Sequence, residues 1–301
     1  MQLTQLHLQL TSACNLHCTF CGQAREKALM SRQDWFSVLE QAAVSLERPT
    51  VTIWGGEALL SPDFAAVSEY AAKRGFFLEL ITNGTLLDRF AELLRGKFQR
   101  IYVSVDGPEA VHDRFRGKGT FAKVRCNLEM IADGRPELVM MSVLTEDTLK
   151  TIGQVPFGLP VDRAIFHELI YLAPEELPES AEEWHKNYTP EYQTVLQSAV
   201  ERFKEQIFPI PVEFQPHPAE GICREPWRHL HVRCDGECGF CTDFTHYTVG
   251  NVRKQTLEEI FSGKAAEAFR SKVEKGECIF CRHCSWKNTP EQIIHFPYEL
   301  K

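Results

Sequence analysis

The sequence lacks any segment that resembles a membrane span or a secretory signal. No stretch approaches the roughly 18 uninterrupted apolar residues that cross a bilayer. The first residues, MQLTQLHLQLTSAC, alternate polar and apolar side chains, whereas a signal peptide has a basic start followed by an apolar block. We therefore interpret them as a strand and expect a cytoplasmic protein.

The sequence also lacks an excess of positive charge, internal repeats and low-complexity tracts. Its formal net charge is −8 and its pI is about 5.8, so nothing in the total charge favours nucleic acid as a partner, although a local basic patch is compatible with that total. The content of 44% hydrophobic and 25% charged residues is typical of a globular protein. A length of 301 residues allows one large domain with a small appendage.

Short runs rich in β-branched and aromatic residues alternate with longer amphipathic segments. Strands separated by helices of this length form a parallel sheet with right-handed crossovers. The pattern predicts an α/β fold, either an open doubly wound sheet or a complete or partial barrel. The predicted strands are 3–10, 50–54, 76–81, 100–105, 137–144 and 163–171, and the predicted helices lie near 31–46, 62–74, 86–95, 120–133 and 146–154.

After Tyr171 the character of the sequence changes. Residues 172–180 (LAPEELPES) predict a linker, 184–206 predict a helix, and the proline-rich 208–218 (FPIPVEFQPHP) predict an extended connector. Seven cysteines follow from Cys223 onward, which is enough for metal to organise a small module. We therefore expect two domains, 1–215 and 216–301.

Ten of the eleven cysteines lie in tight local clusters, and Cys126 alone stands apart; we expect it to be a small hydrophobe on the buried face of a helix. Cytosolic thiols are kept reduced, so clustered cysteines indicate metal. Cys14, Cys18 and Cys21 are spaced C-x3-C-x2-C, and no fourth cysteine is near. Zinc would need a fourth ligand such as His17, whereas a 4Fe–4S cluster held by three thiolates leaves one iron open to a small molecule.

Each informative motif near the N-terminus directly follows a predicted strand. The cysteine loop is the first, and it is followed by WGGE (54–57), TNG (82–84) and SVDG (104–107). The C-terminal ends of parallel strands meet at one edge of the sheet, so the four motifs should form one site.

With these motifs the sequence resembles the radical S-adenosylmethionine (radical SAM) superfamily over residues 8 to 145. The resemblance implies a partial (β/α)6 barrel, a 4Fe–4S cluster on the three cysteines, and a 5′-deoxyadenosyl radical released from S-adenosylmethionine to take hydrogen from a substrate. It also implies a reductase, flavodoxin or ferredoxin as electron donor. The positions that it places at the cofactor are Phe20, Gly55, Gly56, Glu57, Thr82, Asn83, Ser104 and Arg116.

Some of these residues have plainer interpretations. Thr82 and Asn83 can end a strand and cap the next helix, and Arg116 can be a surface arginine. His167 and Glu168 alternate along a strand, so one of them should point into the barrel, where it would touch adenine or substrate or simply be a core side chain.

The C-terminal cysteines resemble the SPASM and shorter twitch modules, which implies a cysteine-rich β-hairpin and helix that bind an auxiliary 4Fe–4S cluster. The spacings are Cys223-x12-Gly236-x4-Cys241 and Cys278-x2-Cys281-x2-Cys284. Alignment with the usual ending gives the ligands Cys223, Cys241, Cys281 and Cys284. A second auxiliary cluster on Cys234, Cys238 and Cys241 is the alternative. Cys234 and Cys238 are otherwise candidates for hydrogen donation to a substrate radical.

The resemblance implies an oxidoreductase, either a peptide maturase or a small-molecule dehydrogenase. The predicted first strand begins almost at Met1, so we expect no N-terminal peptide-recognition domain, which weakens the peptide alternative. A methyltransferase is weaker still because no cobalamin-binding domain is evident. The alternative from another class is a non-enzymatic iron–sulfur or zinc module, which gives no role to the GGE segment.

Overall fold

In the computed structural model the protein is described over residues 3–23, 29–45, 49–133, 136–168, 190–215, 221–242, 247–278, 281, 284–287 and 290–299. The predicted linker at 172–180 lies outside these ranges. The strands are β1 (Gln5–Thr11), β2 (Thr50–Gly55), β3 (Phe77–Thr82), β4 (Arg100–Ser104), β5 (Glu137–Leu144), β6 (Arg163–Glu168), β7 (Val212–Gln215), β8 (His229–Val232), β9 (Glu237–Gly239), β10 (Gly250–Asn251) and β11 (Ile294–Phe296).

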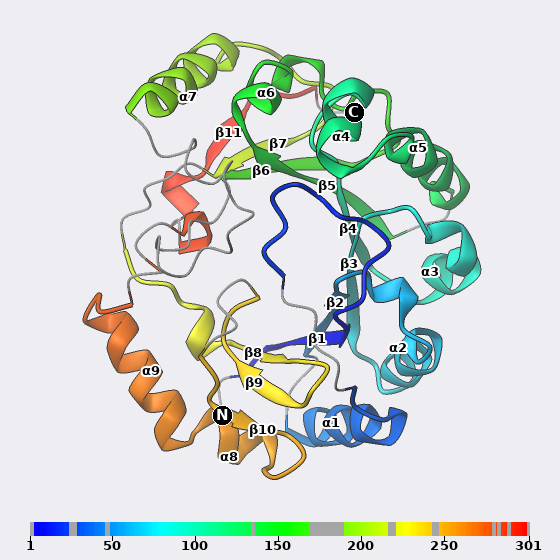
Figure 1. Ribbon diagram of the computed structural model, residues 1–301, viewed down its shortest axis with the longest axis vertical. Helices are drawn as coiled ribbons and strands as arrows, with labels where there is room; N and C mark the ends of the chain where they lie inside the picture. The colour runs from blue at the N-terminus through cyan, green and yellow to red at the C-terminus, as the bar shows by residue number, and fades with distance from the viewer. Residues whose placement is uncertain are drawn as a thin grey trace.

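These strands form a single sheet in the order β10-β9-β8-β1-β2-β3-β4-β5-β6-β7-β11. The sheet curls into an open ring with the helices on its outer side (Figure 1). The helices are α1 (Arg32–Ser45), α2 (Phe64–Lys73), α3 (Ala91–Lys97), α4 (Glu109–Arg116), α5 (Thr120–Ile131), α6 (Glu146–Leu149), α7 (Pro190–Phe203), α8 (Leu257–Phe261) and α9 (Lys264–Glu274).

The central part of the sheet confirms the predicted parallel α/β barrel class. Neighbouring strands from β1 to β7 are parallel throughout. The sequence analysis missed β7 because prolines surround it. Pro211 immediately precedes the strand, so its missing N–H removes none of the hydrogen bonds that β7 makes to its neighbours. The helix α4 (Glu109–Arg116) was not predicted from the sequence either.

The C-terminal segment belongs to the same sheet. β8 pairs in parallel with β1, from Gln5 opposite His229 to Leu8 opposite Val232. β9 returns antiparallel to β8 through a turn in which Gly236 has a φ of 88°, as the predicted hairpin at Asp235-Gly236 requires. β11 pairs antiparallel with β7 at the other end of the sheet. The expected boundary at 216 thus separates two stretches of chain that share one sheet.

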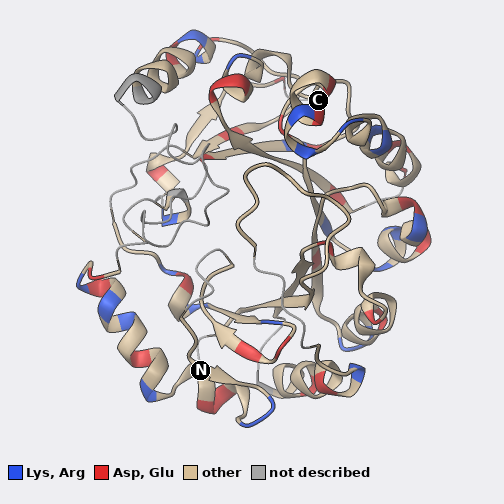
Figure 2. Cartoon of the chain, in the orientation of Figure 1, with Lys and Arg blue, Asp and Glu red and all other residues tan. Residues whose placement is uncertain are grey.

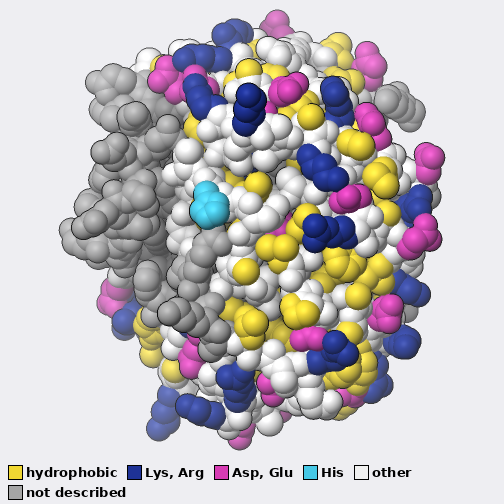
Figure 3. All heavy atoms as spheres, turned by 45° about the vertical axis from the view of Figure 1, so that its right-hand side comes forward, with side chains coloured by type: hydrophobic (Ala, Val, Ile, Leu, Met, Phe, Trp, Pro, Cys, Tyr) yellow, Lys and Arg dark blue, Asp and Glu magenta, His cyan; other side chains and the backbone are white. Residues whose placement is uncertain are grey.

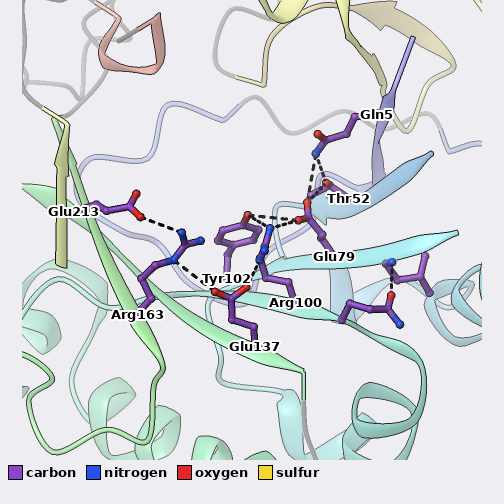
Figure 4. Close-up of polar contacts among 10 residues, drawn as sticks. Gln5, Thr52, Glu79, Arg100, Tyr102, Glu137, Arg163 and Glu213 are labelled. Carbon is purple, nitrogen blue, oxygen red and sulfur yellow. Dashed lines mark hydrogen bonds and ion pairs between the residues drawn. The ribbon is translucent and has the colours of Figure 1, made fainter. Parts of the chain in front are cut away.

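Alternation along the strands separates two environments. Leu6 and Leu8 of β1 are fully buried in the main apolar core, whereas Gln5 of the same strand joins a polar network inside the barrel (Figure 4). We call this network the barrel belt. It lies in the N-terminal halves of the strands, and its members are Gln5, Thr52, Glu79, Arg100, Tyr102, Glu137, Arg163 and Glu213.

The barrel belt joins the seven strands β1 to β7 through charge-assisted contacts. Arg100 lies 2.9 Å from Glu79 and 2.5 Å from Glu137. Arg163 lies 3.6 Å from Glu137 and 3.0 Å from Glu213. Each arginine therefore links two carboxylates, and the network closes the end of the barrel opposite the rim at which the predicted motifs lie.

Most charged side chains lie on the outer helices and loops (Figure 2). On the face shown in Figure 3, cationic and anionic side chains are interspersed and no large patch has a single sign. None of the helices within the described ranges combines the length and the hydropathy of a bilayer span.

Candidate active site

The cysteine loop directly follows β1 at the C-terminal rim of the barrel. Its backbone is fixed by short hydrogen bonds: the Cys21 amide donates to the Cys18 carbonyl at 3.1 Å, and the Thr19 amide donates to the Phe115 carbonyl at 3.0 Å. Cys14 and Cys18 are half-buried and Cys21 is exposed. The three thiols thus lie on one loop, and solvent reaches that loop at Cys21.

The two glycines of the GGE segment allow β2 to approach this loop. A Cβ on Gly55 would lie 2.3 Å from the carbonyl oxygen of Thr11, and a Cβ on Gly56 would lie 2.4 Å from that of Ser12. Because these are backbone atoms, no side-chain rotation could relieve the clash. The close approach lets the Gly56 amide donate to the Thr11 carbonyl at 2.9 Å. The two glycines therefore hold the end of β2 against the cysteine loop.

Glu57 is buried, with 1% of its surface exposed. Its carboxylate accepts hydrogen bonds from the Leu59 amide at 3.1 Å, the Thr82 hydroxyl at 2.8 Å and the Asn83 amide at 2.8 Å. Burial raises the pKa of Glu57, and the three hydrogen bonds oppose that rise. The carboxylate therefore ties the end of β2 to the end of β3, and Thr82 acts in this contact.

Asn83 connects the end of β3 to the cysteine loop. Its Nδ2 lies 3.8 Å from Sγ of Cys14 and donates to the Oδ1 of Asn15 at 3.0 Å. Its Oδ1 accepts from the hydroxyl and amide of Thr85 at 2.6 and 2.9 Å, which fixes the amide orientation. An N–H group directed at a thiolate is an arrangement that tunes iron–sulfur centres. The sequence analysis gave no role to Asn15.

Arg116 is not a surface arginine: its side chain is 10% exposed and pairs with the fully buried Asp106. The two Arg116–Asp106 hydrogen bonds measure 2.5 and 3.3 Å. The remaining Nη1 lies 3.9 Å from Sγ of Cys18, and the guanidinium carbon lies 5.4 Å from the centre of the Phe20 ring. Asp106 belongs to the predicted SVDG motif, but the motif gave no role to this carboxylate. Its carboxylate also accepts the Val143 amide at 3.1 Å.

The electrostatics of the loop suit a bound metal centre. Burial raises the pKa of the Cys18 thiol, while the positive charge of Arg116 lowers it and the neighbouring thiols Cys21 and Cys14 raise it further. A metal centre removes these protons, and Arg116 then offsets the negative charge of the thiolates. Three thiols, one guanidinium and one amide N–H therefore fit an iron–sulfur cluster.

The remaining rim residues lie on the inner face of the barrel. Ser104 is half-buried at the end of β4, on the face shared with Arg100 of the barrel belt. His167 shares the face of Arg163, and its ring centroid lies 5.1 Å from that of Trp286. His167, not Glu168, is therefore the residue of β6 on the inner face, and burial lowers its pKa.

Several C-terminal cysteines gather around Cys281. Sγ of Cys281 lies 3.3 Å from Sγ of Cys278. The hydrogen bond with Cys278, burial, and the negative charges of Cys223 and Cys284 raise the pKa of Cys281. Burial also raises the pKa of Cys223 to about 11. The alignment-based ligand set omits Cys278, which lies beside Cys281 and whose charge acts on Cys223.

The hairpin cysteines have a different environment. Cys234 and Cys238 are 0% and 1% exposed, and Cys238 belongs to the main core. Burial raises the pKa of Cys238 far above its usual range. Cys241 instead packs against a second apolar cluster, made by Phe20, Phe115, Val143 and Cys284. The three hairpin cysteines thus do not share one environment.

This second apolar cluster connects the two ends of the chain. Cys18 of the N-terminal loop packs against it, as do Cys241, Cys278 and Cys281 of the C-terminal segment. Thiols separated by more than 200 positions therefore border the same small group of side chains.

Comparison with known proteins agrees with this geometry. Residues 8–155 match the family model of the radical SAM superfamily, and residues 223–285 match that of the SPASM iron-sulfur cluster-binding domain. The chain is 27% identical over 312 residues to the AdoMet-dependent heme synthase of Methanosarcina barkeri, covering 91% of this chain and 87% of the relative.

Two further proteins are similar to this chain over most of its length. The antilisterial bacteriocin subtilosin biosynthesis protein AlbA of Bacillus subtilis is 26% identical over 308 residues, covering 92% of this chain and 65% of the relative. The solved structure of anSMEcpe with bound AdoMet and the Cp18Cys peptide has the same fold, with a TM-score of 0.70 and 20% identity over 95% of this chain and 88% of that one. The chain belongs to the radical SAM superfamily and carries a SPASM domain, so its cofactors are S-adenosylmethionine and 4Fe–4S clusters.

Proposed function

We propose that this radical SAM enzyme is an oxidoreductase that carries out a net oxidation of a peptide or small-molecule substrate at the barrel rim. The observation that carries the proposal is the apolar cluster around Phe20 and Phe115, against which Cys18 of the N-terminal loop packs together with Cys278 and Cys281. A second metal centre so close to the first suits removal of an electron from a substrate held between them.

We further propose how the chain holds its cofactor. Cys14, Cys18 and Cys21 would hold the 4Fe–4S cluster, and S-adenosylmethionine bound there would supply the radical chemistry that removes hydrogen from the substrate. Ser104 and the backbone of the GGE segment would contact the cofactor. The other predicted residues position this site, as Glu57 and Thr82 do by fixing the ends of β2 and β3, and as Asn83, Arg116 and Phe20 do at the thiols.

Water exclusion is the second contribution of these residues. Phe20 is 7% exposed and Phe115 is 3% exposed, and their ring centroids lie 5.7 Å apart. Their apolar surface beside Cys18 keeps solvent from reactive species formed at the rim. His167 and Trp286 extend this wall toward β6.

The substrate class is proposed from the relatives. One relative is a heme synthase and another is a bacteriocin biosynthesis protein, and the solved structure of anSMEcpe contains a peptide. Both parts of the proposed class, a small molecule and a peptide, are therefore represented. A reductase, flavodoxin or ferredoxin is the proposed source of the electron that starts the reaction.

For the auxiliary cluster we propose the ligands Cys223, Cys278, Cys281 and Cys284, with Cys241 as the competing fourth donor. Cys278 is favoured because its Sγ already lies 3.3 Å from that of Cys281. The burial of Cys234 and Cys238 supports a structural role for both and opposes hydrogen donation to a substrate.

The function is tested by anaerobic reconstitution followed by dithionite and S-adenosylmethionine. We expect 5′-deoxyadenosine from the wild type and none from the triple variant in which Cys14, Cys18 and Cys21 are alanine. Absence of 5′-deoxyadenosine from the fully loaded wild type would refute the enzymatic proposal and leave the iron–sulfur carrier as the alternative.

The ligand set is tested in the background of that triple variant, where only auxiliary iron remains. Cys278→Ala should lose most of this iron, whereas Cys241→Ala should retain about four irons per chain. The reverse result would restore the alignment-based set. About eight irons in the triple variant itself would establish a second auxiliary cluster.

A further inference from the structure

Three histidines gather on the inner face of the sheet, apart from all the cysteines. His7 lies on β1, and His229 and His231 lie on β8. His7 is directly opposite His231 in the parallel ladder, and their rings stack with centroids 4.1 Å apart. The ring of His229 lies 5.1 Å from that of His7. We call this group the histidine triad.

The ring nitrogens of the histidine triad converge. One ring nitrogen from each histidine lies within 4.8 Å of those of the other two. Within the described parts of the chain, both ring nitrogens of His7 and the Nδ1 of His231 lack a hydrogen-bond partner. A buried polar atom without a partner costs about 1–3 kcal/mol, so unpartnered nitrogens on two facing rings indicate that something else binds there.

A carboxylate orients the third imidazole of the histidine triad. A carboxylate oxygen of Glu225 contacts Nδ1 of His229, an arrangement that fixes the ring and leaves Nε2 free to bind.

We propose that the histidine triad binds one divalent transition-metal ion of the zinc type, separate from the iron–sulfur centres. Three imidazoles with an open fourth position are an established zinc arrangement. Bonds of about 2.0–2.1 Å place the ligand nitrogens about 3.3 Å apart, so nitrogens that now lie within 4.8 Å must draw together by about 1.5 Å at most. Because ring lone pairs lie in the ring plane, one of the two stacked rings of His7 and His231 must also rotate about its Cβ–Cγ bond when the ion binds. The unpartnered Nε1 of the buried Trp54, whose ring lies 6.5 Å from that of His231, is available to a water in the fourth position.

The site has a structural role in this proposal. It takes one ligand from the N-terminal half of β1 and two from the short strand β8. The ion would therefore tie the strand that begins the barrel to the strand that leads into the cysteine-rich segment.

The test uses the cluster-loaded full chain, treated with a chelator and then given Zn²⁺. We expect one zinc per chain by elemental analysis. X-ray absorption at the zinc edge should show only nitrogen and oxygen neighbours, at about 2.0–2.1 Å. Zinc held by sulfur at about 2.3 Å, or no retained zinc, would overturn the proposal on the wild-type protein alone.

Variants locate the ion. His231→Ala, and separately His7→Ala, should weaken zinc binding at least about 100-fold, because each removes one of three ligands. His295→Ala is the matched control, since His295 is an exposed histidine on β11, and it should bind zinc as the wild type does. Unchanged iron and sulfide content shows that the variants are folded, and equal zinc binding by the His231 variant would contradict the site.

Discussion

At the scale of single residues, the ion pair of Asp106 and Arg116 anchors a positive charge beside the cysteine loop. Asp106 is fully buried and Arg116 is its ion-pair partner. The same guanidinium reaches Cys18 and the ring of Phe20. One side chain therefore neutralises a buried carboxylate and faces the thiols.

Arg116→Leu should lower the free energy of unfolding by about 3–5 kcal/mol, because it leaves Asp106 buried without its cation. Arg114 is the matched control: it lies on the same helix as Arg116 and pairs with Asp147 of α6 but is 53% exposed, and Arg114→Leu should cost about 0–1 kcal/mol. Urea denaturation measures both. The double variant Asp106→Asn/Arg116→Leu should cost less than the sum of its two single variants, and strict additivity would contradict the coupling.

His112 provides a pH-dependent contribution. Burial, followed by the charge of Arg116, lowers its pKa from 6.5 to about 4. A base with a lowered pKa in the folded state stabilises the fold above its unfolded pKa and loses that contribution as the pH falls through the lowered value. Between pH 6.5 and 4 the loss should reach roughly 3 kcal/mol.

His112→Asn should therefore flatten the dependence of the unfolding free energy on pH in this window, relative to the wild type. His295→Gln, at an exposed position, should leave the wild-type pH dependence in place. Identical curves for the wild type and the His112 variant would show that another group is responsible.

At the scale of elements, the end of β2 and the cysteine loop depend on each other. Gly56 has the carbonyl oxygens of Ser12 and Ala13 at 2.4 and 2.5 Å from the position of a Cβ. The neighbouring Glu57 amide donates to the Ala13 carbonyl at 2.8 Å. A side chain at Gly56 must therefore separate two backbones.

Gly56→Ala should cost at least about 2 kcal/mol and remove the iron bound by the N-terminal loop, because it displaces the cysteines. Gly96→Ala in α3 is the control: no atom lies within 4 Å of its Cβ position, and replacement of a helical glycine should be neutral or stabilise by up to about 1 kcal/mol. Iron analysis and urea denaturation report the two effects. Full iron content in the Gly56 variant would contradict the dependence.

At the scale of the whole molecule, the sheet unites the two matched domains. Four residue pairs, from Gln5 opposite His229 to Leu8 opposite Val232, join β1 to β8. Gln5 is also a member of the barrel belt, which continues to Glu213 on β7. Loss of β8 would expose an edge of β1 next to this polar network.

Hydrogen exchange under native conditions should therefore show that β1 and β8 open together with the same free energy, as one cooperative unit. Two independently stable domains would behave differently, since the amides of β8 would exchange through a less costly opening while β1 stayed protected. The amides of β3, which is flanked by β2 and β4, provide the reference for global unfolding.

The sequence by itself determined the class of fold and the chemistry. Strand and helix periodicity gave the parallel α/β barrel, and the spacing of Cys14, Cys18 and Cys21 with the GGE segment gave the superfamily, because these signals are local in the chain. The prolines around β7 obscured its strand pattern in the sequence. The strand forms because β6 and β11, which lie elsewhere in the chain, pair with it.

Only the tertiary structure decided the roles of individual side chains. It hydrogen-bonds the carboxylate of Glu57 to Thr82 at the end of β3, pairs Arg116 with Asp106, and places Cys278 beside Cys281. It also brought His7 to His231, more than 200 positions away. Residue spacing describes one loop at a time, whereas burial and charge pairing depend on which strands the closed sheet makes adjacent.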